Sequence, residues 1–439
     1  MRKNAIFLSL VGILLLARPA VAQLNQVFTG IFNEILNTRF TLSGSLGQHG
    51  THFQEAARTA TQQLSPALNS LIASNVSSFP LSATAAGATF DFSTGAPVML
   101  RESLGPIFAE NARTLGQGKL NVGFNYTYLG LEKFRGVPTE NIRFTFTHLD
   151  FPKTGVLGDN PNESDLVNLN LDLNVNANIL VLLSTYGITN NLDVGIAIPF
   201  AKISLLGNSK ATVESFTLAR DDTARHQFGS DPTRPQLTTF AGYNASATGL
   251  SDIALRLKYS FLQGAEIDLA ALLDVRLPTG DEADFLGTGK TNAKLTWIMS
   301  KKIGDFLPHL NLGYERRGAD RDSDEFELIA GFDQKIVSGV SFAAEFLGEF
   351  DVNRGEAIEL LAGETEIIER PRGSLPPLVR QIDLSNVPER DRDNTMSAAL
   401  GFRAAPSERL LLFGNILVPL NDGGLRSNVV PTFGVAMNF

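Results

Sequence analysis

The stretch that most constrains this chain is residues 165–204, because apolar and polar residues alternate along it. Its first part, residues 167–176, reads VNLNLDLNVN, with Val or Leu at every odd position and Asn or Asp at every even one. A period of two is the pattern of a β-strand, whose successive side chains point to opposite faces. We expect the apolar face to meet hydrocarbon, since the rest of the chain repeats this pattern and supplies no covering layer.

The alternation continues to Leu183, passes a turn at residues 189–191 and resumes from Leu192 to Phe200. Two alternating strands joined by a short turn that contains Asn predict a hairpin. The first strand is longer than the roughly 9 to 11 residues that a tilted strand needs to cross a bilayer. We therefore expect its Asn-rich half to stand outside the membrane.

The first residues have the organisation of a secretory signal peptide. Two basic residues precede an apolar run at residues 5–17, and residues 20–22, AVA, offer the small side chains that signal peptidase requires. The alternative, a transmembrane anchor, is disfavoured because the run is shorter than roughly 18 residues. We predict a cleaved signal peptide at residues 1–22 and a mature chain that begins at Gln23.

Composition excludes several classes of protein. The 439 residues contain no Cys, which excludes disulfides, thiolate metal sites and a Cys nucleophile. Without the signal peptide, 34 basic residues face 46 acidic ones, a net charge of about −12, which argues against nucleic acid or an anionic lipid surface as a partner. A hydrophobic content of 43% is too high for a disordered chain, and no long apolar run suggests a helical membrane protein.

We divide the mature chain into three segments. Residues 23–89 carry apolar residues at helical spacing and predict a helical N-terminal extension, periplasmic or otherwise associated with the barrel. A solvated arm and a plug both remain open for it. Residues 90–118 are a Gly/Pro-rich lead-in or hatch segment, and residues 119–439 hold the alternating strands.

Connections between the strands alternate between turns of about two to five residues and much longer intervals, which is typical of outer-membrane barrels. Two of the intervals, at residues 207–247 and 353–392, are predicted to be external loops. We count thirteen alternating segments, whereas a closed bacterial barrel needs an even number. Treating residues 142–148 as an external hairpin arm gives twelve strands, and recruiting part of residues 90–99 gives fourteen. We predict an all-β fold, a transmembrane antiparallel up-and-down β-barrel of twelve strands.

Charged residues lie opposite the apolar positions of these strands. A charge that faced lipid would cost about 2 to 4 kcal/mol at the bilayer midplane, so we expect these side chains to line the lumen. The candidates are Arg256, Lys258, Asp274, Arg276, Lys294, Glu315, Glu327, Asp333, Glu345, Glu349 and Arg403. Two interpretations remain open: a salt-bridge ladder that fills a narrow barrel, or the lining of a pore.

Other motifs give no case for catalysis, a metal or a cofactor. The segment GTGKT at residues 287–291 has Asp284 where a phosphate-binding loop needs its first glycine, and a strand follows it. The acidic residues of 280–284 match no calcium loop, and no HExxH pair is present. No His has a Ser two residues away on the same strand face, so we predict that the protein is not an enzyme.

Several short blocks together carry a family resemblance. They are residues 103–110 (SLGPIFAE), 115–119 (LGQGK), 186–189 (YGIT), 193–195 (DVG), 198–200 (IPF), 249–253 (GLSDI) and 277–281 (LPTGD). With these blocks the chain resembles, from about residue 90 to residue 439, the bacterial outer-membrane transporter-like family labelled for the meta-pathway of phenol degradation, which is similar to long-chain fatty-acid channels. The resemblance implies a barrel that carries small hydrophobic or aromatic compounds across the outer membrane, without catalytic residues.

Our leading hypothesis is a passive outer-membrane channel, in which external loops capture a small hydrophobic solute and the lead-in segment gates the lumen. Its partners would be the solute, outer-membrane lipid and lipopolysaccharide. The gate candidates are Ser103, Gly105, Pro106, Phe108 and Glu110.

The alternative is a non-transport structural or adhesion barrel that presents long external loops and a periplasmic helical arm, with a periplasmic partner for the helices. A continuous passage would favour transport, and a lumen filled by paired charges would favour the scaffold.

Overall fold

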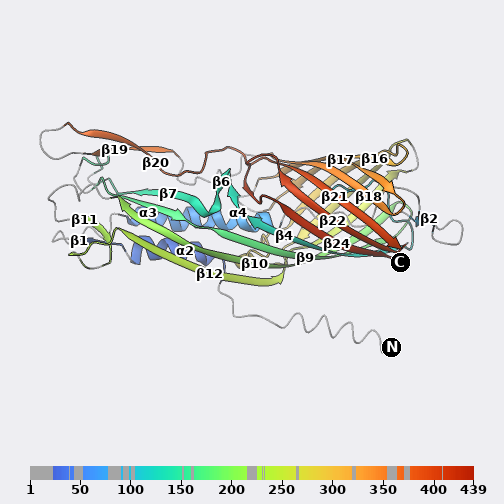
Figure 1. Ribbon diagram of the computed structural model, residues 1–439, viewed down its shortest axis with the longest axis horizontal. Helices are drawn as coiled ribbons and strands as arrows, with labels where there is room; N and C mark the ends of the chain where they lie inside the picture. The colour runs from blue at the N-terminus through green and yellow to red at the C-terminus, as the bar shows by residue number, and fades with distance from the viewer. Residues whose placement is uncertain are drawn as a thin grey trace, which may run out of the picture.

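The computed structural model of the chain describes residues 23–38, 40–43, 53–77, 90–91, 98–99, 104–150, 153–159, 163–214, 225–229, 231, 233–263, 266–318, 323–352, 363–369, 376–407 and 409–439. The predicted signal peptide and the gate candidate Ser103 lie outside these residues. Figure 1 shows an elongated molecule, with a barrel at one end and a sheet covered by helices at the other.

Twelve antiparallel strands close into the barrel, which confirms the predicted fold and strand number. The ring closes because β10 pairs with β9 through residues 193–206 and with β13 through residues 192–197. In ring order the strands are β13 (Ile253–Leu262), β14 (Asp268–Leu277), β15 (Asn292–Ser300), β16 (Phe306–Arg316), β17 (Glu325–Val337), β18 (Val340–Asp351), β21 (Thr395–Ser407), β22 (Leu410–Pro419), β24 (Val430–Asn438), β4 (Leu120–Leu131), β9 (Asn174–Gly187) and β10 (Leu192–Glu214).

The alternative count of fourteen strands is wrong. Residues 90–99 contribute β2 (Phe90–Asp91) and β3 (Val98–Met99), which pair with each other in a separate sheet. Residues 142–148 contribute β7 (Ile142–Thr147), which pairs with β8 (Leu166–Leu171) beyond the ring. The prediction that this segment is not one of the strands of the ring is therefore confirmed.

The two ends of the barrel differ in their connections. Turns at residues 188–191, 301–305 and 338–339 lie at one end, which we call the short-turn end, together with the strand ends at Leu262, Asp268, Ser407 and Leu410. At the same end, the backbone of Phe439 exchanges two hydrogen bonds with Leu120. The opposite, long-loop end carries the described parts of the connections at residues 132–173, 278–291, 317–324, 352–394 and 420–429.

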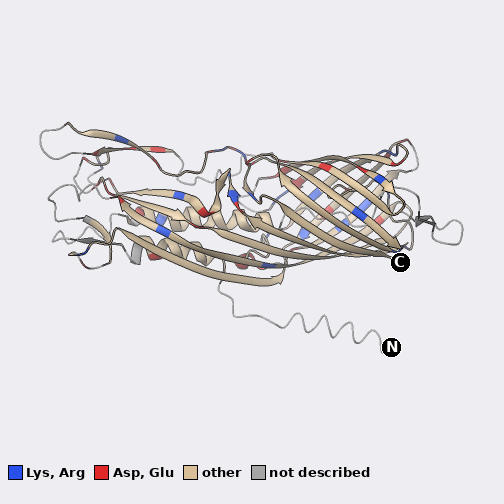
Figure 2. Ribbon diagram, viewed as in Figure 1, with Lys and Arg blue, Asp and Glu red and all other residues tan. Residues whose placement is uncertain are grey.

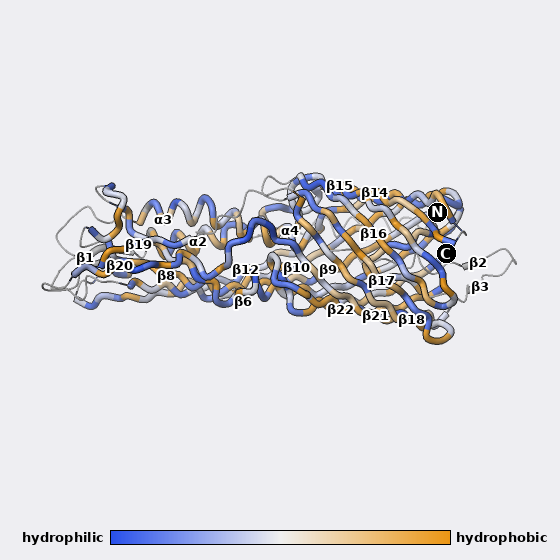
Figure 3. The backbone as a smooth tube through the Cα atoms, turned by 90° about the horizontal axis from the view of Figure 1, so that it is seen from above, coloured by the Kyte–Doolittle hydropathy of each residue, from blue (hydrophilic) through white to orange (hydrophobic). Residues whose placement is uncertain are grey.

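Side chains alternate between the two faces of the wall, as in β15, where Leu295, Trp297 and Met299 are exposed and the intervening residues are buried. Half-buried aromatic rings lie together near the short-turn end: the ring centroids of Phe332 and Phe306 are 5.0 Å apart. Tyr314 follows eight residues after Phe306 in β16, a height of roughly 20 Å for a tilted strand. The apolar outer face thus extends over a height close to bilayer thickness. Figure 3 shows hydrophobic and hydrophilic residues alternating along the barrel strands.

One prediction about the faces is wrong. Ile179, Val181 and Leu183 of β9 were expected to face lipid, but they point inward and are almost fully buried. Their partners across the strands include Thr127 and Asn125, which belong to the inner wall. The even positions of this half of β9 are also apolar, so the period of two does not identify the outer face.

The interval at residues 207–247 is not a simple external loop. Strand β10 is 23 residues long and continues to Glu214, and β12 (Thr238–Leu250) pairs with it along residues 200–212. Strand β8 pairs with the last five residues of β10. Together these strands extend the barrel wall past the long-loop end. Residues 238–250, TTFAGYNASATGL, contain few large apolar side chains, so the strand pattern is weak.

Helices cover the inner face of this extension. They are α2 (Gln26–Asn33), α3 (Gln54–Thr59) and α4 (Ser65–Ser77), with the π-helical turns η1 (Glu34–Thr38) and η3 (Ala60–Leu64). Phe32 of α2 meets Phe146 of β7 edge to face, with ring centroids 6.5 Å apart. Val167 and Leu169 are fully buried in the same core, so this part of the alternating stretch meets a protein layer and not hydrocarbon.

We call these helices, together with the extension formed by β8, β12 and the upper part of β10, the surface module.

No helix among the described residues is both long enough and apolar enough to span a bilayer. The remaining short elements are β1 (Phe40–Ser43), β5 (Lys133–Phe134), β6 (Val137–Pro138), β11 (Arg225–Phe228), β19 (Glu364–Glu369), β20 (Leu378–Asp383) and β23 (Leu425–Arg426), with the 3₁₀ turns η4 (Thr139–Asn141) and η6 (Glu282–Asp284).

Candidate functional site: a plug in the barrel lumen

Residues 104–118, which we call the plug, precede β4 and lie inside the barrel without forming a helix or a strand. Ile107, Ala109 and Ala112 have no exposed surface, although the segment is rich in Gly and Pro. Side chains from the barrel wall bind the plug along its whole length. The plug therefore depends on the wall for its conformation.

Glu345 of β18 holds the centre of the plug. Its carboxylate accepts hydrogen bonds from three consecutive backbone N–H groups, those of Ile107, Phe108 and Ala109, at 2.5, 2.8 and 3.2 Å. Successive N–H groups that point to one centre form an anion-binding nest, and bonds to an ionised acceptor are about twice as strong as neutral ones. His309 of β16 lies 3.3 Å from the same carboxylate.

Arg403 of β21 binds the beginning of the plug from the neighbouring strand. Its guanidinium donates to the carbonyls of Leu104 and Pro106 and lies 5.3 Å from the ring centroid of Phe413. The amide of Leu104 also donates to Ser341 Oγ at 3.2 Å. Arg403 is almost fully buried, so its charge is compensated by the plug carbonyls and the aromatic ring.

Glu110 joins the plug to β13. One oxygen lies 2.7 Å from the guanidinium of Arg256, and the other lies 3.5 Å from Nζ of Lys258. Arg256 also contacts Asp274 of β14 at 3.2 Å. Two wall cations thus neutralise the plug carboxylate.

The last part of the plug is bound near the short-turn end. Arg113 pairs with Asp268 at 2.8 Å, and the amide of Leu115 donates to Asp193 at 2.9 Å. Further bonds join Ala112 N to Ser300 Oγ at 3.3 Å, Thr114 Oγ1 to Asn190 O at 2.5 Å and Gln117 N to Asn190 Oδ1 at 3.2 Å.

Beside the plug, charges of the inner wall lie at paired positions on five consecutive strands. The row runs through Arg256, Asp274, Lys294, Glu315 and Glu325. The two glutamates face each other across β16 and β17, and Arg317 forms an ion pair with each. Figure 2 shows both signs of charge interspersed over the barrel strands. This arrangement supports a salt-bridge ladder, although such pairs add little net stability after desolvation.

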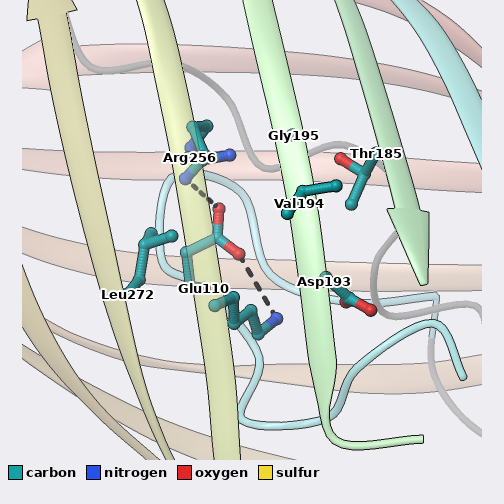
Figure 4. Close-up of a pocket in the computed structure, with 8 residues that line it drawn as sticks. Glu110, Thr185, Asp193, Val194, Gly195, Arg256 and Leu272 are labelled. Carbon is teal, nitrogen blue, oxygen red and sulfur yellow. Dashed lines mark hydrogen bonds and ion pairs between the residues drawn. The ribbon is translucent and has the colours of Figure 1, made fainter. Parts of the chain in front are cut away.

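Described residues of the plug and the wall line two small cavities. One, of about 20 Å³, lies against Glu110, Asp193 and Arg256 (Figure 4), and the other, of about 30 Å³, lies against Phe108 and Lys294. A cavity needs roughly 10 to 15 Å³ to hold one water molecule. These cavities fit one or two waters, and neither fits an aromatic solute.

The remaining lumen candidates have other contacts. Arg276 donates to the carbonyl of Ser77 at the end of α4, and Glu327 lies 3.2 Å from Nζ of Lys294. Asp333 lies 3.5 Å from His309. Glu349 accepts from the hydroxyl of Thr395 at 2.5 Å.

The gate candidates Gly105, Pro106, Phe108 and Glu110 all lie in the plug. The plug contacts made by Arg113, Asp193, Asp268, His309, Ser300 and Ser341 were not predicted. For the residues of the wall, the only signal in the sequence is a polar side chain at an inward position of a strand.

The acidic loop at residues 280–284 binds the beginning of the described chain. Leu24 N donates to Asp284 Oδ1 at 3.3 Å, and Asn25 N donates to the carbonyl of Ala283 at 2.9 Å. Burial raises the pKa of Asp284, the Leu24 amide opposes this effect, and the charge of Asp281 adds to it. The described residues contain no group of three or more His, Asp or Glu side chains arranged to hold a metal.

Comparison with known proteins gives one family. The family described as "Putative MetA-pathway of phenol degradation" matches residues 158–360, just under half of the chain. This match confirms the resemblance predicted from the sequence blocks. No curated protein matches the chain.

Solved structures with a similar outline are barrels. The NanC porin is 9% identical, with a TM-score of 0.34 and coverage of 72% of this chain and 98% of that one. A FadL homologue of Pseudomonas aeruginosa is 9% identical, with a TM-score of 0.32 and coverage of 73% and 90%. The toluene transporter TodX of P. putida is 10% identical, with a TM-score of 0.32 and coverage of 73% and 89%. No function is inferred from similarities this low.

Proposed function

We propose that this chain, in which residues 158–360 match the phenol-degradation family named above, is a bacterial outer-membrane channel for small hydrophobic or aromatic compounds. The apolar exterior band would contact lipid and lipopolysaccharide, and transport would be passive. The plug occupies the lumen beside two cavities that are too small for an aromatic solute, so passage would require the plug to move.

The observation that carries this proposal is the attachment of the plug to the wall. Glu345 and Glu110 hold it through hydrogen bonds and ion pairs, which water can replace when the plug moves. Strand β9 adds an apolar inner surface at Ile179, Val181 and Leu183, which suits an apolar solute. Because polar contacts hold the plug and an apolar surface lies beside it, we favour a plug that can move over a plug that is a permanent part of the core.

Substitution of Glu345 tests the gate. Glu345→Gln keeps the size of the side chain but removes the charge that three plug amides bind. We expect purified Glu345→Gln protein in planar bilayers to open more often than the wild type, and vesicles containing it to admit aromatic solutes several-fold faster.

The matched control is Glu349→Gln, because Glu349 lies on the same strand and binds Thr395 and not the plug. It should conduct like the wild type. Equal behaviour of the wild type and Glu345→Gln would contradict the gate.

The second candidate function is a scaffold that presents its long-loop end without transport. The small cavities beside the plug and the paired charges of the inner wall favour it. A scaffold predicts no solute flux in the wild type or in any plug variant. A periplasmic partner of the helices, considered for this alternative, would require the helices to lie at the short-turn end.

A further inference from the structure

The helices of the surface module lie at the long-loop end of the barrel, although they belong to the N-terminal part of the chain (Figure 1). The first described residues of this helical segment, Leu24 and Asn25, bind the loop that follows β14. Its last helix ends at Ser77, whose carbonyl accepts from Arg276 near the end of the same strand. Both termini of the helical segment are therefore anchored at one end of the barrel.

The chain is found next at the opposite end. Leu104 binds Ser341, the second residue of β18, directly after the turn at residues 338–339. Asp193 and Asn190, which bind the end of the plug, also lie at the short-turn end. Figure 1 places β2 beyond this end as well. The helical segment and the two ends of the plug are therefore bound at opposite ends of the barrel.

We propose that the helical segment, residues 23–77, is displayed outside the cell. In outer-membrane barrels the short turns face the periplasm and the long loops face outward. This inference rests on the proposed membrane location but not on solute transport, and it assigns the helices to the cell surface and not to the periplasm.

Single cysteines test the orientation, because the chain contains none of its own. Arg58→Cys reports on the exposed face of α3, Glu389→Cys on a long connection and Lys301→Cys on a short turn, and all three positions are exposed. Each variant is produced in cells with the full-length chain and treated with a membrane-impermeant maleimide, before or after the outer membrane is permeabilised.

We expect Arg58→Cys and Glu389→Cys to be labelled to a similar extent on intact cells, and Lys301→Cys to need permeabilisation. Labelling of Arg58→Cys only after permeabilisation, with Glu389→Cys labelled on intact cells, would overturn the inference and leave the membrane location standing. If all three positions required permeabilisation, the membrane location and this inference would both be wrong.

Discussion

The guanidinium of Arg256 lies 2.7 Å from a carboxylate oxygen of Glu110, so a cation on the barrel wall is paired with an anion on the plug. The same guanidinium contacts Asp274 on the next strand. Arg256 therefore links the plug to the row of charged residues on the wall.

Loss of this cation should destabilise the barrel. Arg256→Met leaves two buried carboxylates without their shared partner, and breaking a buried pair typically costs about 3 to 5 kcal/mol. We expect urea unfolding in detergent to show a loss of this order. The double variant Arg256→Met/Glu110→Gln should recover part of it, and a purely additive double variant would contradict the pairing.

The outward face of β15 should not tolerate charge. Leu295 is exposed at the middle of the strand, so Leu295→Arg should reduce the free energy of folding into vesicles by about 2 to 4 kcal/mol. Leu420→Arg, at an exposed position of a long connection, serves as the control and should fold like the wild type. Similar losses for both variants would mean that Leu295 does not face lipid.

The docking of the N-terminal segment should depend on pH through Asp284. Because burial raises the pKa of this carboxyl in the folded protein, its ionised form opposes docking. Docking should therefore strengthen as the pH falls through the raised pKa, and become constant below the ordinary range of an aspartate, about 3.9.

Asp284→Asn keeps an oxygen acceptor for Leu24 and removes the titration. We expect the thermal stability of the surface module to change less between about pH 4 and pH 7 in this variant than in the wild type. If the pH profile of Asp284→Asn were the same as that of the wild type, a group other than Asp284 would be responsible for the pH dependence.

Strand periodicity predicted the architecture well. In a barrel wall with lipid on one side, apolar and polar side chains must alternate along each strand. β15 and the lower half of β10 show this directly: Leu295, Val194 and Ile196 keep the period that the sequence displays. The strand number followed from the requirement for closure, with β7 correctly left outside the ring.

The errors in assigning the outer face arise where the surroundings of a strand change along its length. In β9, Val181 belongs to the apolar series of the sequence, yet its side chain points inward. The partners of the plug could not be predicted either. Glu345 and Ile107 are far apart in the sequence and are joined by backbone groups, which no side-chain pattern reveals.

The gate is tested most directly by a reversible covalent lock between the plug and the wall. Ala112 N lies 3.3 Å from Ser300 Oγ, so the variant Ala112→Cys/Ser300→Cys places two thiols at this contact in a chain without other cysteines. The two single variants control for each substitution. Solute flux into vesicles is measured with the pair oxidised and again after reduction. A gate predicts that flux is abolished in the oxidised protein and restored by reduction. Undiminished flux through the oxidised, fully cross-linked protein would contradict the account.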